Sequence, residues 1–429
     1  LLFVLVPITL VRRYFNRISL LRNDYFLMGA VGLAILALMR LSLILAPAVQ
    51  NALFINVPLL AINYLIPVAG GAMLLRIFLG AEISFVFAVV MSGIAGLFVE
   101  SASHYVAFCL LSSTAAVVAI SQADRRGLII RAGVITGFIS SLTALAIGLI
   151  GIFSEIQIVG GISEVLWGML FAFLGGIFSA IFVMIATPIV ESVSGYISDI
   201  KLLELANLNH PLLRELIGRA PGTYHHSHMV GILGEAAAEA IGAKALFVRV
   251  GAYYHDIGKM KKPSYFIENA KAGDDKHERL SPHMSALIVA AHVKDGVDMA
   301  EKAGIPKIIA DIIPEHHGTR LISFFYDKAK NQADQSVQKV DQKDFMYPGP
   351  KPQTREAAIL MLADAAEASV RSLKEKSPTR IQQTVQKVIT DIFMEKQLDE
   401  CELTLKDLNN ISRAFVRILL GIYHSRIEY

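Results

Sequence analysis

The sequence has little charge and almost no cysteine. Only 18% of its 429 residues are Asp, Glu, Lys or Arg, whereas 54% are hydrophobic, and this balance excludes a protein that is soluble along its whole length. The formal net charge of +3 gives no support for a nucleic-acid polymer as partner. Cys109 and Cys401 have neither paired nor metal-ligand spacing, which argues against a disulfide framework and a zinc ribbon. We therefore expect one membrane part and one soluble part.

Two further patterns are absent after residue 196. No run of alternating apolar residues predicts a sheet, and no Gly-rich P-loop or GxGxxG motif predicts nucleotide binding by those routes. Short amphipathic segments with capping residues predict helices instead. The stretch 331–353, which contains Pro348-Gly349-Pro350, lacks periodicity and is predicted to be a solvated loop. The predicted fold class is therefore all-α.

Long apolar runs fill the first 190 residues. About 17 to 25 apolar residues make one membrane crossing. Seven candidate spans follow from this length, near 1–12, 25–47, 57–79, 83–99, 105–121, 129–152 and 164–190. The two short segments within 83–121 leave two alternatives open, namely two spans or one re-entrant hairpin. Pro67 and Gly70-Gly71 interrupt the third span, which predicts a hinge or a tolerated kink.

Basic residues orient these spans. The first span is followed by Arg12, Arg13, Arg17 and Arg22. The fifth span is followed by Arg125, Arg126 and Arg131. The connections after spans two, four and six contain no Lys or Arg. By the positive-inside rule, odd-numbered spans end in the cytoplasm. We therefore expect a multi-pass protein in the lipid bilayer of the cell membrane, with the soluble domain in the cytoplasm.

The chain is predicted to have three parts. Leu1 is followed at once by apolar residues without a preceding basic segment, so a signal peptide is disfavoured and the first span is expected to be truncated. Residues 1–190 are expected to form a seven-helix transmembrane bundle. A connector over 191–210 then leads to an all-helical domain over 211–429.

Histidines and aspartates recur in short motifs along this helical domain. The motifs are Tyr224-His225-His226-Ser227, Tyr254-His255-Asp256-Ile257-Gly258-Lys259, Ala291-His292-Val293, Glu315-His316-His317-Gly318 and Leu362-Ala363-Asp364. A lone histidine on an apolar face is usually a core residue, but the set predicts metal binding. In an adjacent His-Asp pair the imidazole can bind one ion while the carboxylate bridges two. Nitrogen and oxygen ligands without thiolate favour iron or manganese over a structural zinc.

Two such ions about 3.5 to 4 Å apart can activate a hydroxide and hold a phosphoryl oxygen. The residues alone therefore predict metal-dependent hydrolysis of a phosphoester.

The order of these motifs resembles the HD phosphohydrolase superfamily, and specifically the seven-transmembrane receptors with an intracellular HD domain. Tyr265-Phe266-Ile267-Glu268-Asn269 and His316-His317-Gly318-Thr319 extend the resemblance. It implies a bacterial phosphodiesterase that cleaves cyclic di-AMP to linear pApA with two divalent ions, iron or manganese. Family members also carry an extracytoplasmic domain ahead of the spans. The given sequence is expected to lack that domain, so it does not indicate which extracytoplasmic ligand the domain would sense.

The resemblance also implies a role for each motif residue. One ion would be held by His226, His255, Asp256 and Asp364, and the other by Asp256, His292, His316 and His317. Asp256 would bridge the ions, and Asp256, His255 and Lys259 would be catalytic. Two roles are open for Lys259: its ammonium could contact a phosphate, or it could complement the dipole at the C-terminal end of a helix. His225 is expected to support its neighbour or the fold, and Arg320 to meet a phosphate or to lie on the surface.

Several alternatives remain open. The related cyclic di-GMP enzymes continue after the double histidine into Gly-Tyr-Pro, whereas this chain reads Gly318-Thr319-Arg320, so that subgroup is disfavoured. A degenerate HD domain that binds a nucleotide without turnover, and a phosphohydrolase of another nucleotide, are alternative functions. A transporter is disfavoured because the spans offer no repeated broken helices. The sequence leaves the oligomeric state open, with a homodimer as one option.

Overall fold

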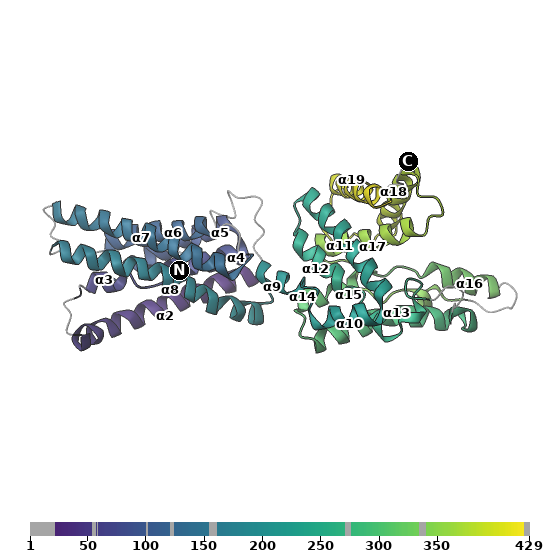
Figure 1. The fold of residues 1–429 in the computed structure, drawn as a ribbon, viewed down its shortest axis with the longest axis horizontal. Helices are drawn as coiled ribbons and strands as arrows, with labels where there is room; N and C mark the ends of the chain where they lie inside the picture. Colours follow the sequence, from purple (N-terminus) through teal and green to yellow (C-terminus); the bar gives the residue numbers. More distant parts are fainter. Residues whose placement is uncertain are drawn as a thin grey trace, which may run out of the picture. The chain divides into compact units, whose positions relative to one another are not determined.

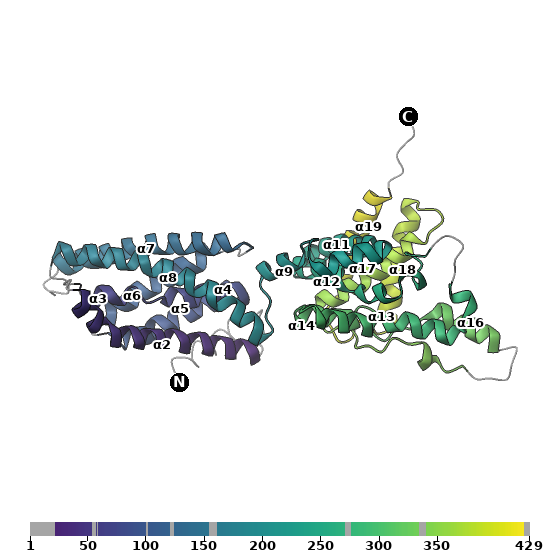
Figure 2. The same ribbon diagram turned by 60° about the horizontal axis from the view of Figure 1, so that its bottom comes forward.

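The computed structural model describes residues 22–53, 57, 59–99, 102–120, 124–153, 161–270, 276–333 and 340–423. Within these ranges the chain is helical, and its only extended pairing is an isolated bridge between Leu321 and Met346 (Figures 1 and 2). The predicted all-α class is therefore confirmed. The chain divides into two compact units, Leu1–Ile200 and Lys201–Tyr429.

The first unit is a bundle of apolar helices. Its helices are α2 (Arg22–Leu53), α3 (Leu59–Asn63), α4 (Val68–Leu79), α5 (Ala81–Gly96), α6 (Ala102–Ala119), α7 (Arg126–Phe153) and α8 (Ile162–Ser194). Five segments are long and apolar enough to cross a membrane: Arg22–Ala48, Ala61–Leu79, Ala102–Ala119, Arg126–Ile152 and Ile162–Ser194. They coincide with five of the predicted spans, and the shorter α5 matches the span predicted at 83–99. The span predicted at 1–12 lies outside the described residues.

Helices α5 and α6 bear on the re-entrant alternative. They pack against each other and contain 16 and 18 residues, so each rises about 24 to 27 Å. That length approaches the apolar layer of about 30 Å, which favours two crossings over one shallow hairpin.

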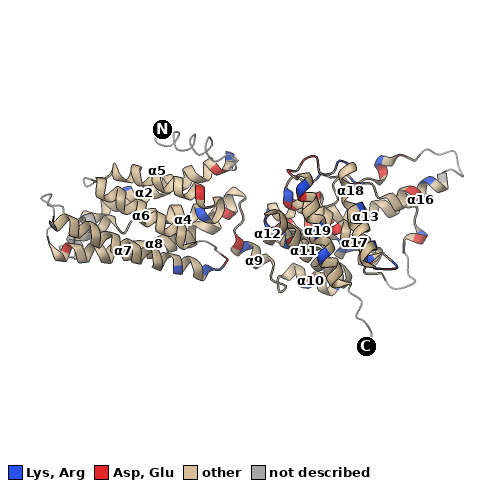
Figure 3. Ribbon diagram, turned by 90° about the horizontal axis from the view of Figure 1, so that it is seen from above, with Lys and Arg blue, Asp and Glu red and all other residues tan. Residues whose placement is uncertain are grey.

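Hydrophobic side chains cover the outside of this bundle. Leu33, Val118, Phe138 and Leu166 are all at least 60% exposed. The helices carry few charged residues between their ends, whereas charge is spread over the second unit (Figure 3). An apolar surface of this extent fits lipid rather than water. The first unit is therefore a membrane domain.

Glycines allow α7 and α8 to run side by side along their length (Figures 1 and 2). A Cβ atom added to Gly176 would lie 2.2 Å from the backbone nitrogen of Gly137, and one added to Gly133 would lie 2.5 Å from Cβ of Ala180. Such close backbone contact is how membrane helices gain packing energy, because lipid offers them no hydrophobic driving force.

The third span is interrupted rather than merely kinked. Helix α3 ends at Asn63 and α4 begins at Val68, with Pro67 between them. Pro67 has no N–H to donate to the carbonyl of Asn63, as a continuous helix would require. The N–H of Ile66 and the hydroxyl of Tyr105 donate to that carbonyl instead, at 3.2 and 3.0 Å. The break is thus satisfied partly by α6.

The second unit packs its helices around α17 (Arg355–Arg371), which is buried along most of its length. The other helices are α9 (Asp199–Leu205), α10 (Pro211–Arg219), α11 (Pro221–Ile241), α12 (Ala245–Tyr254), α13 (Pro282–Lys302), α14 (Lys307–Ala310), α15 (Ile312–Glu315), α16 (Ser323–Ala333), α18 (Pro378–Met394) and α19 (Leu405–Ile422), with 3₁₀ turns η1 (Ile257–Lys261), η2 (Pro263–Tyr265), η3 (Lys276–Arg279) and η4 (Gln342–Phe345). Helix α17 contacts α11, α12, α15, α18 and α19.

The stretch predicted as a solvated loop, 331–353, is irregular and mostly exposed from residue 340 on, but it is anchored to the rest of the unit. Phe345 is buried, and its carbonyl accepts from the N–H of Ile322 at 2.8 Å. The N–H of Tyr347 donates to the carbonyl of Arg320 at 3.0 Å. The segment is ordered by pairing with a distant part of the chain, which local periodicity cannot reveal. Residues 334–339 lie outside the described ranges.

Gly175 tests the packing at the interrupted span. A Cβ atom there would lie 2.2 Å from the carbonyl oxygen of Tyr64, so Gly175→Ala should destabilise the full chain by about 1–3 kcal/mol. Gly93→Ala is the control, because no atom lies within 4 Å of its added Cβ and alanine favours a helix. Thermal unfolding in detergent measures both variants. Equal stability of the two variants would contradict the close contact.

Candidate metal centre

Seven of the predicted site residues lie together in the second unit. His226 comes from α11, His255 and Asp256 from the end of α12, His292 from α13, His316 and His317 from the turn after α15, and Asp364 from α17. They form two groups, Asp256-His292-His316-His317 and His226-His255-Asp364, and within each group one ligand atom per residue lies within 4.8 Å of the others. The helical frame therefore gathers residues that are up to 138 positions apart.

The carboxylate of Asp256 faces both groups. Its Oδ2 lies 3.2 Å from Nε2 of His255 and 3.6 Å from Nε2 of His226. Its Oδ1 lies 3.3 Å from Nε2 of His292 and 3.7 Å from Nε2 of His316. A carboxylate with one oxygen toward each group has the geometry that a bridging ligand needs.

Asp364 has a similar position on the other side. Its Oδ1 lies 3.0 Å from Nε2 of His226, and its Oδ2 lies 3.8 Å from Nδ1 of His317. Asp364 therefore also faces both groups, although the family resemblance implied a role at only one ion.

Backbone carbonyls fix the orientation of three imidazoles. Nδ1 of His255, His292 and His316 bonds the carbonyl three residues earlier, at 2.7, 2.5 and 2.6 Å. A carbonyl can only accept, so Nδ1 carries the proton and Nε2 keeps its lone pair. The Nε2 atoms of these histidines are buried and make no hydrogen bond within the described residues.

A buried acceptor without a hydrogen bond lowers the stability of the fold by about 1–3 kcal/mol. Several such acceptors converge at this centre. Oδ1 of Asp256 is also buried without a hydrogen bond among the described residues. These atoms are the nitrogen and oxygen donors that divalent transition metals accept. The donor set therefore fits divalent metal ions.

Burial sets the protonation of most ligands. It lowers the pKa of His292, His316 and His317, and that of His316 falls to about 3, with the neighbouring His255 adding to the effect. Burial alone would raise the pKa of Asp256, but His255 and Lys259 outweigh it and hold that pKa well below its usual range. Neutral imidazoles around an ionised carboxylate are the forms that bind a metal.

His226 differs from the other histidines. Its Nδ1 lies 2.6 Å from Oε2 of Glu367, and Arg371 donates to both oxygens of that glutamate at 3.1 and 2.9 Å. Burial disfavours a charged imidazole, yet the hydrogen bonds with Asp364 and Glu367 raise the pKa of His226 to about 9. A buried carboxylate behind a metal-binding imidazole fixes its tautomer and increases its basicity.

Lys259 is held by two carboxylates. Its Nζ lies 2.6 Å from Oδ2 of Asp256 and 2.9 Å from Oε1 of Glu268, and it sits over the ring of Phe266 at 5.1 Å from the ring centre. Burial opposes the ammonium charge, but Asp256 and Glu268 raise its pKa. The ammonium therefore stabilises the ionised form of Asp256.

The two remaining candidates lie outside the cluster. The side chain of His225 is exposed, although it directly precedes His226. Arg320 forms an ion pair with Glu395, at 2.7 Å between Nε and Oε2. Neither residue belongs to the two groups of ligands.

Sequence reasoning missed three residues around the centre. Glu367 lies one helical turn after Asp364, a spacing that places both on one face of α17. Glu268 lies in the motif Tyr265-Phe266-Ile267-Glu268-Asn269, which indicates the family but gives no role for the glutamate. Tyr347 stacks on His317, with 4.1 Å between ring centres, but its segment carries no periodic signal.

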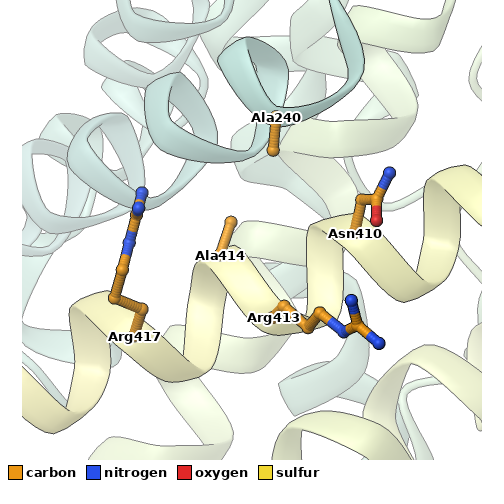
Figure 4. A pocket seen from close by; sticks show the side chains of 5 residues that line it. All are labelled: Ala240, Asn410, Arg413, Ala414 and Arg417. Carbon is orange, nitrogen blue, oxygen red and sulfur yellow. The ribbon is translucent and has the colours of Figure 1, made fainter.

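A separate cavity of about 280 Å³ lies between α11 and α19. Ala240 from α11 and Asn410, Arg413, Ala414 and Arg417 from α19 line it (Figure 4). Figure 4 shows the two guanidinium groups pointing apart rather than converging. None of the seven ligands lines this cavity.

Two families match the chain in sequence. The family described as "7TM receptor with intracellular HD hydrolase" matches residues 1–198, and the HD domain family matches residues 223–369. The cyclic-di-AMP phosphodiesterase PgpH of Bacillus subtilis is 40% identical over 379 residues, which are 86% of this chain and 51% of the relative. That of Listeria monocytogenes is 38% identical over 371 residues, again 86% of this chain and 50% of the relative. The chain thus spans about half the length of these relatives.

A solved structure also resembles part of the chain. The crystal structure of the L. monocytogenes PgpH HD domain is 44% identical, covers 50% of this chain and 100% of its own, and has a TM-score of 0.48. The same domain in complex with cyclic-di-AMP covers 51% of this chain at the same identity and TM-score.

The raised pKa of His226 predicts that metal binding releases a proton. Below pH 9 the metal must displace a proton from Nε2 of His226, so its apparent affinity should rise about tenfold per pH unit from pH 7 toward 9 and then level off. His292, His316 and His317 are already neutral over this range. Calorimetric titration with Mn²⁺ at pH 7 and 8, in buffers of different ionisation enthalpy, counts the protons released. A pH-independent affinity without proton release would refute the raised pKa.

Glu367 predicts a second effect on metal affinity. Glu367→Ala removes the partner of His226 Nδ1 and should weaken Mn²⁺ binding about 10–100-fold, whereas Glu367→Gln keeps an acceptor and should weaken it less. Glu395→Ala is the matched control, because Glu395 also pairs with an arginine but lies outside the ligand groups. Metal affinity is read from a competition titration with a chelator. Wild-type affinity in Glu367→Ala would show that the bond is dispensable.

Proposed function

Because the chain belongs to the family of seven-transmembrane receptors with an intracellular HD hydrolase, we propose that it is a membrane-bound, metal-dependent phosphodiesterase that hydrolyses a cyclic dinucleotide. Cyclic di-AMP, cleaved to linear pApA, is the proposed substrate, because two relatives at 40% and 38% identity are named cyclic-di-AMP phosphodiesterases. The observation that carries the proposal is the buried pair of ligand groups that share the carboxylate of Asp256.

The proposed location is a bacterial cell membrane, with the HD domain in the cytoplasm. Arginines that follow the first and fifth predicted spans support this orientation. We further propose that residues 1–190 form the membrane region, 191–210 the connector and 211–429 the hydrolase domain. Cyclic dinucleotides made inside the cell would then reach the centre directly.

Two divalent ions, iron or manganese, are the proposed cofactors. His226, His255, Asp256 and Asp364 would hold one ion, and Asp256, His292, His316 and His317 the other. When bound, the ions would supply an activated water at neutral pH and stabilise charge on the phosphoryl group. The protein's own part is to hold the ligands in their binding forms and to exclude bulk water.

Lys259 contributes by acting on Asp256. Its ammonium lies 2.6 Å from Oδ2 of Asp256 and keeps that carboxylate ionised in a buried place. Glu268 holds the ammonium from the other side at 2.9 Å. We therefore propose that Lys259 positions and charges a metal ligand, in preference to the phosphate contact that its sequence position also allowed.

The alternative functions differ in what they require of this centre. A degenerate receptor would tolerate the loss of ligands, whereas all seven are present and lie together. A phosphohydrolase of another nucleotide would use the same centre, so only a panel of substrates separates it from the proposed enzyme. Binding of cyclic di-AMP by the metal-loaded full chain without turnover would favour the degenerate receptor.

Asp256→Asn tests the proposal. The amide keeps the shape but removes the charge that both groups share, so the variant should lose bound metal and lose hydrolysis of cyclic di-AMP by more than about 100-fold. His225→Gln is the control, since His225 is exposed beside a ligand and should retain both properties. Metal content by mass spectrometry and release of pApA by chromatography are the measurements. Full metal content and full turnover in Asp256→Asn would sink the proposal.

A further inference from the structure

The membrane domain contains a small cavity beside the interrupted third span, lined by both apolar and polar residues. It has a volume of about 10 Å³. Polar or polarisable residues from four segments line it: Tyr64 at the break, Cys109 and Ser112 from α6, Thr136 and Ser140 from α7, and Ser179 from α8. Ser140 donates to Ser112 at 2.8 Å, so one pair of lining hydroxyls already joins α6 to α7.

Thr136 is the unusual member of this lining. Hydroxyls in membrane helices commonly bond the carbonyl four residues earlier, and in this bundle Ser92, Ser179 and Thr187 do so at 2.7 to 2.9 Å. Thr136 is 0% exposed, and its Oγ1 makes no hydrogen bond within the described part of the chain. Thr136 therefore lines the cavity and carries a buried hydroxyl without a partner among the described residues.

An unpaired hydroxyl is costly in this environment. The hydrocarbon region supplies no hydrogen-bonding solvent, so each polar group there must be satisfied inside the protein. A cavity of about 10–15 Å³, with polar groups around it, is just large enough for one water molecule. Among the residues that the structure describes, no Asp or Glu lines the cavity, so a cation there would be uncompensated.

We propose that this cavity binds a single water molecule, which bonds the hydroxyl of Thr136 and joins it to the Ser112–Ser140 pair. The water links α6 and α7 next to the place where the third span loses its helical hydrogen bonds. Tyr105 of α6 already donates to the carbonyl of Asn63 at that break. The Tyr105 bond thus holds the interrupted span to α6, and the water holds α6 to α7 beside it.

The test is a comparison of Thr136→Val with Thr187→Val in the full chain, reconstituted in lipid nanodiscs. Both threonines are buried, but Thr187 bonds its own helix at 2.7 Å and should tolerate valine with little change. Thr136→Val removes a partner of the water and should lower Tm by about 2–4 °C. A rise in Tm or an unchanged Tm would overturn the proposal, because removing a dry, unpaired hydroxyl is neutral or stabilising.

A second measurement detects the water itself. Hydroxyl radicals generated by a synchrotron pulse from a bound water label adjacent side chains, so Tyr64 and Cys109 should be labelled despite their burial. Thr136→Ser should keep this labelling and wild-type Tm, whereas Thr136→Val should lose both. Absence of labelling in the wild type, or a Thr136→Ser variant that behaves like Thr136→Val, would refute the water site. Stabilisation that requires Na⁺, and is absent when choline replaces it, would replace the water by a cation.

Discussion

The buried carboxylate of Asp256 is the interaction on which the rest of the centre depends. Burial disfavours its charge, so the fold surrounds it with an ammonium and with imidazoles from separate helices. Because charges interact strongly at low dielectric, the positions of these helices are tied to one another through this group. The same carboxylate presents one oxygen to each group of ligands. A single residue thus explains why the helical frame converges where it does.

The sequence was sufficient to predict which seven candidate ligands gather at the centre, but not which residues support them. The seven ligands occur in adjacent pairs or short motifs, and the resemblance of those motifs carries their identity. Glu367 and Tyr347 act across the fold, and their contacts with His226 and His317 depend on tertiary packing that no local pattern encodes. Glu268 stood in a recognised motif, but only its distance from Lys259 reveals its role. The apolar spans were predictable because length and composition alone define a membrane helix.

The two units satisfy buried polar groups by different means. The membrane domain relies on hydroxyls that bond their own helix and on glycines that bring backbones together, since lipid gives neither water nor hydrophobic drive. The second unit instead gathers charges of both signs and leaves several nitrogen lone pairs without a hydrogen bond among its described residues. The unmet lone pairs distinguish a binding centre from a structural network, because a network made only for stability would satisfy them.

The pairing of Lys259 and Arg371 with acidic partners has a consequence for how the protein matures. With His226 protonated, these two cations leave only a small excess of negative charge among Asp256, Asp364, Glu268 and Glu367. Small zinc domains behave otherwise, since they are unfolded until the metal arrives. We therefore expect this polypeptide to complete its fold first and to acquire its ions afterwards. Supply of the metal would then set how much of an already assembled pool of protein is active.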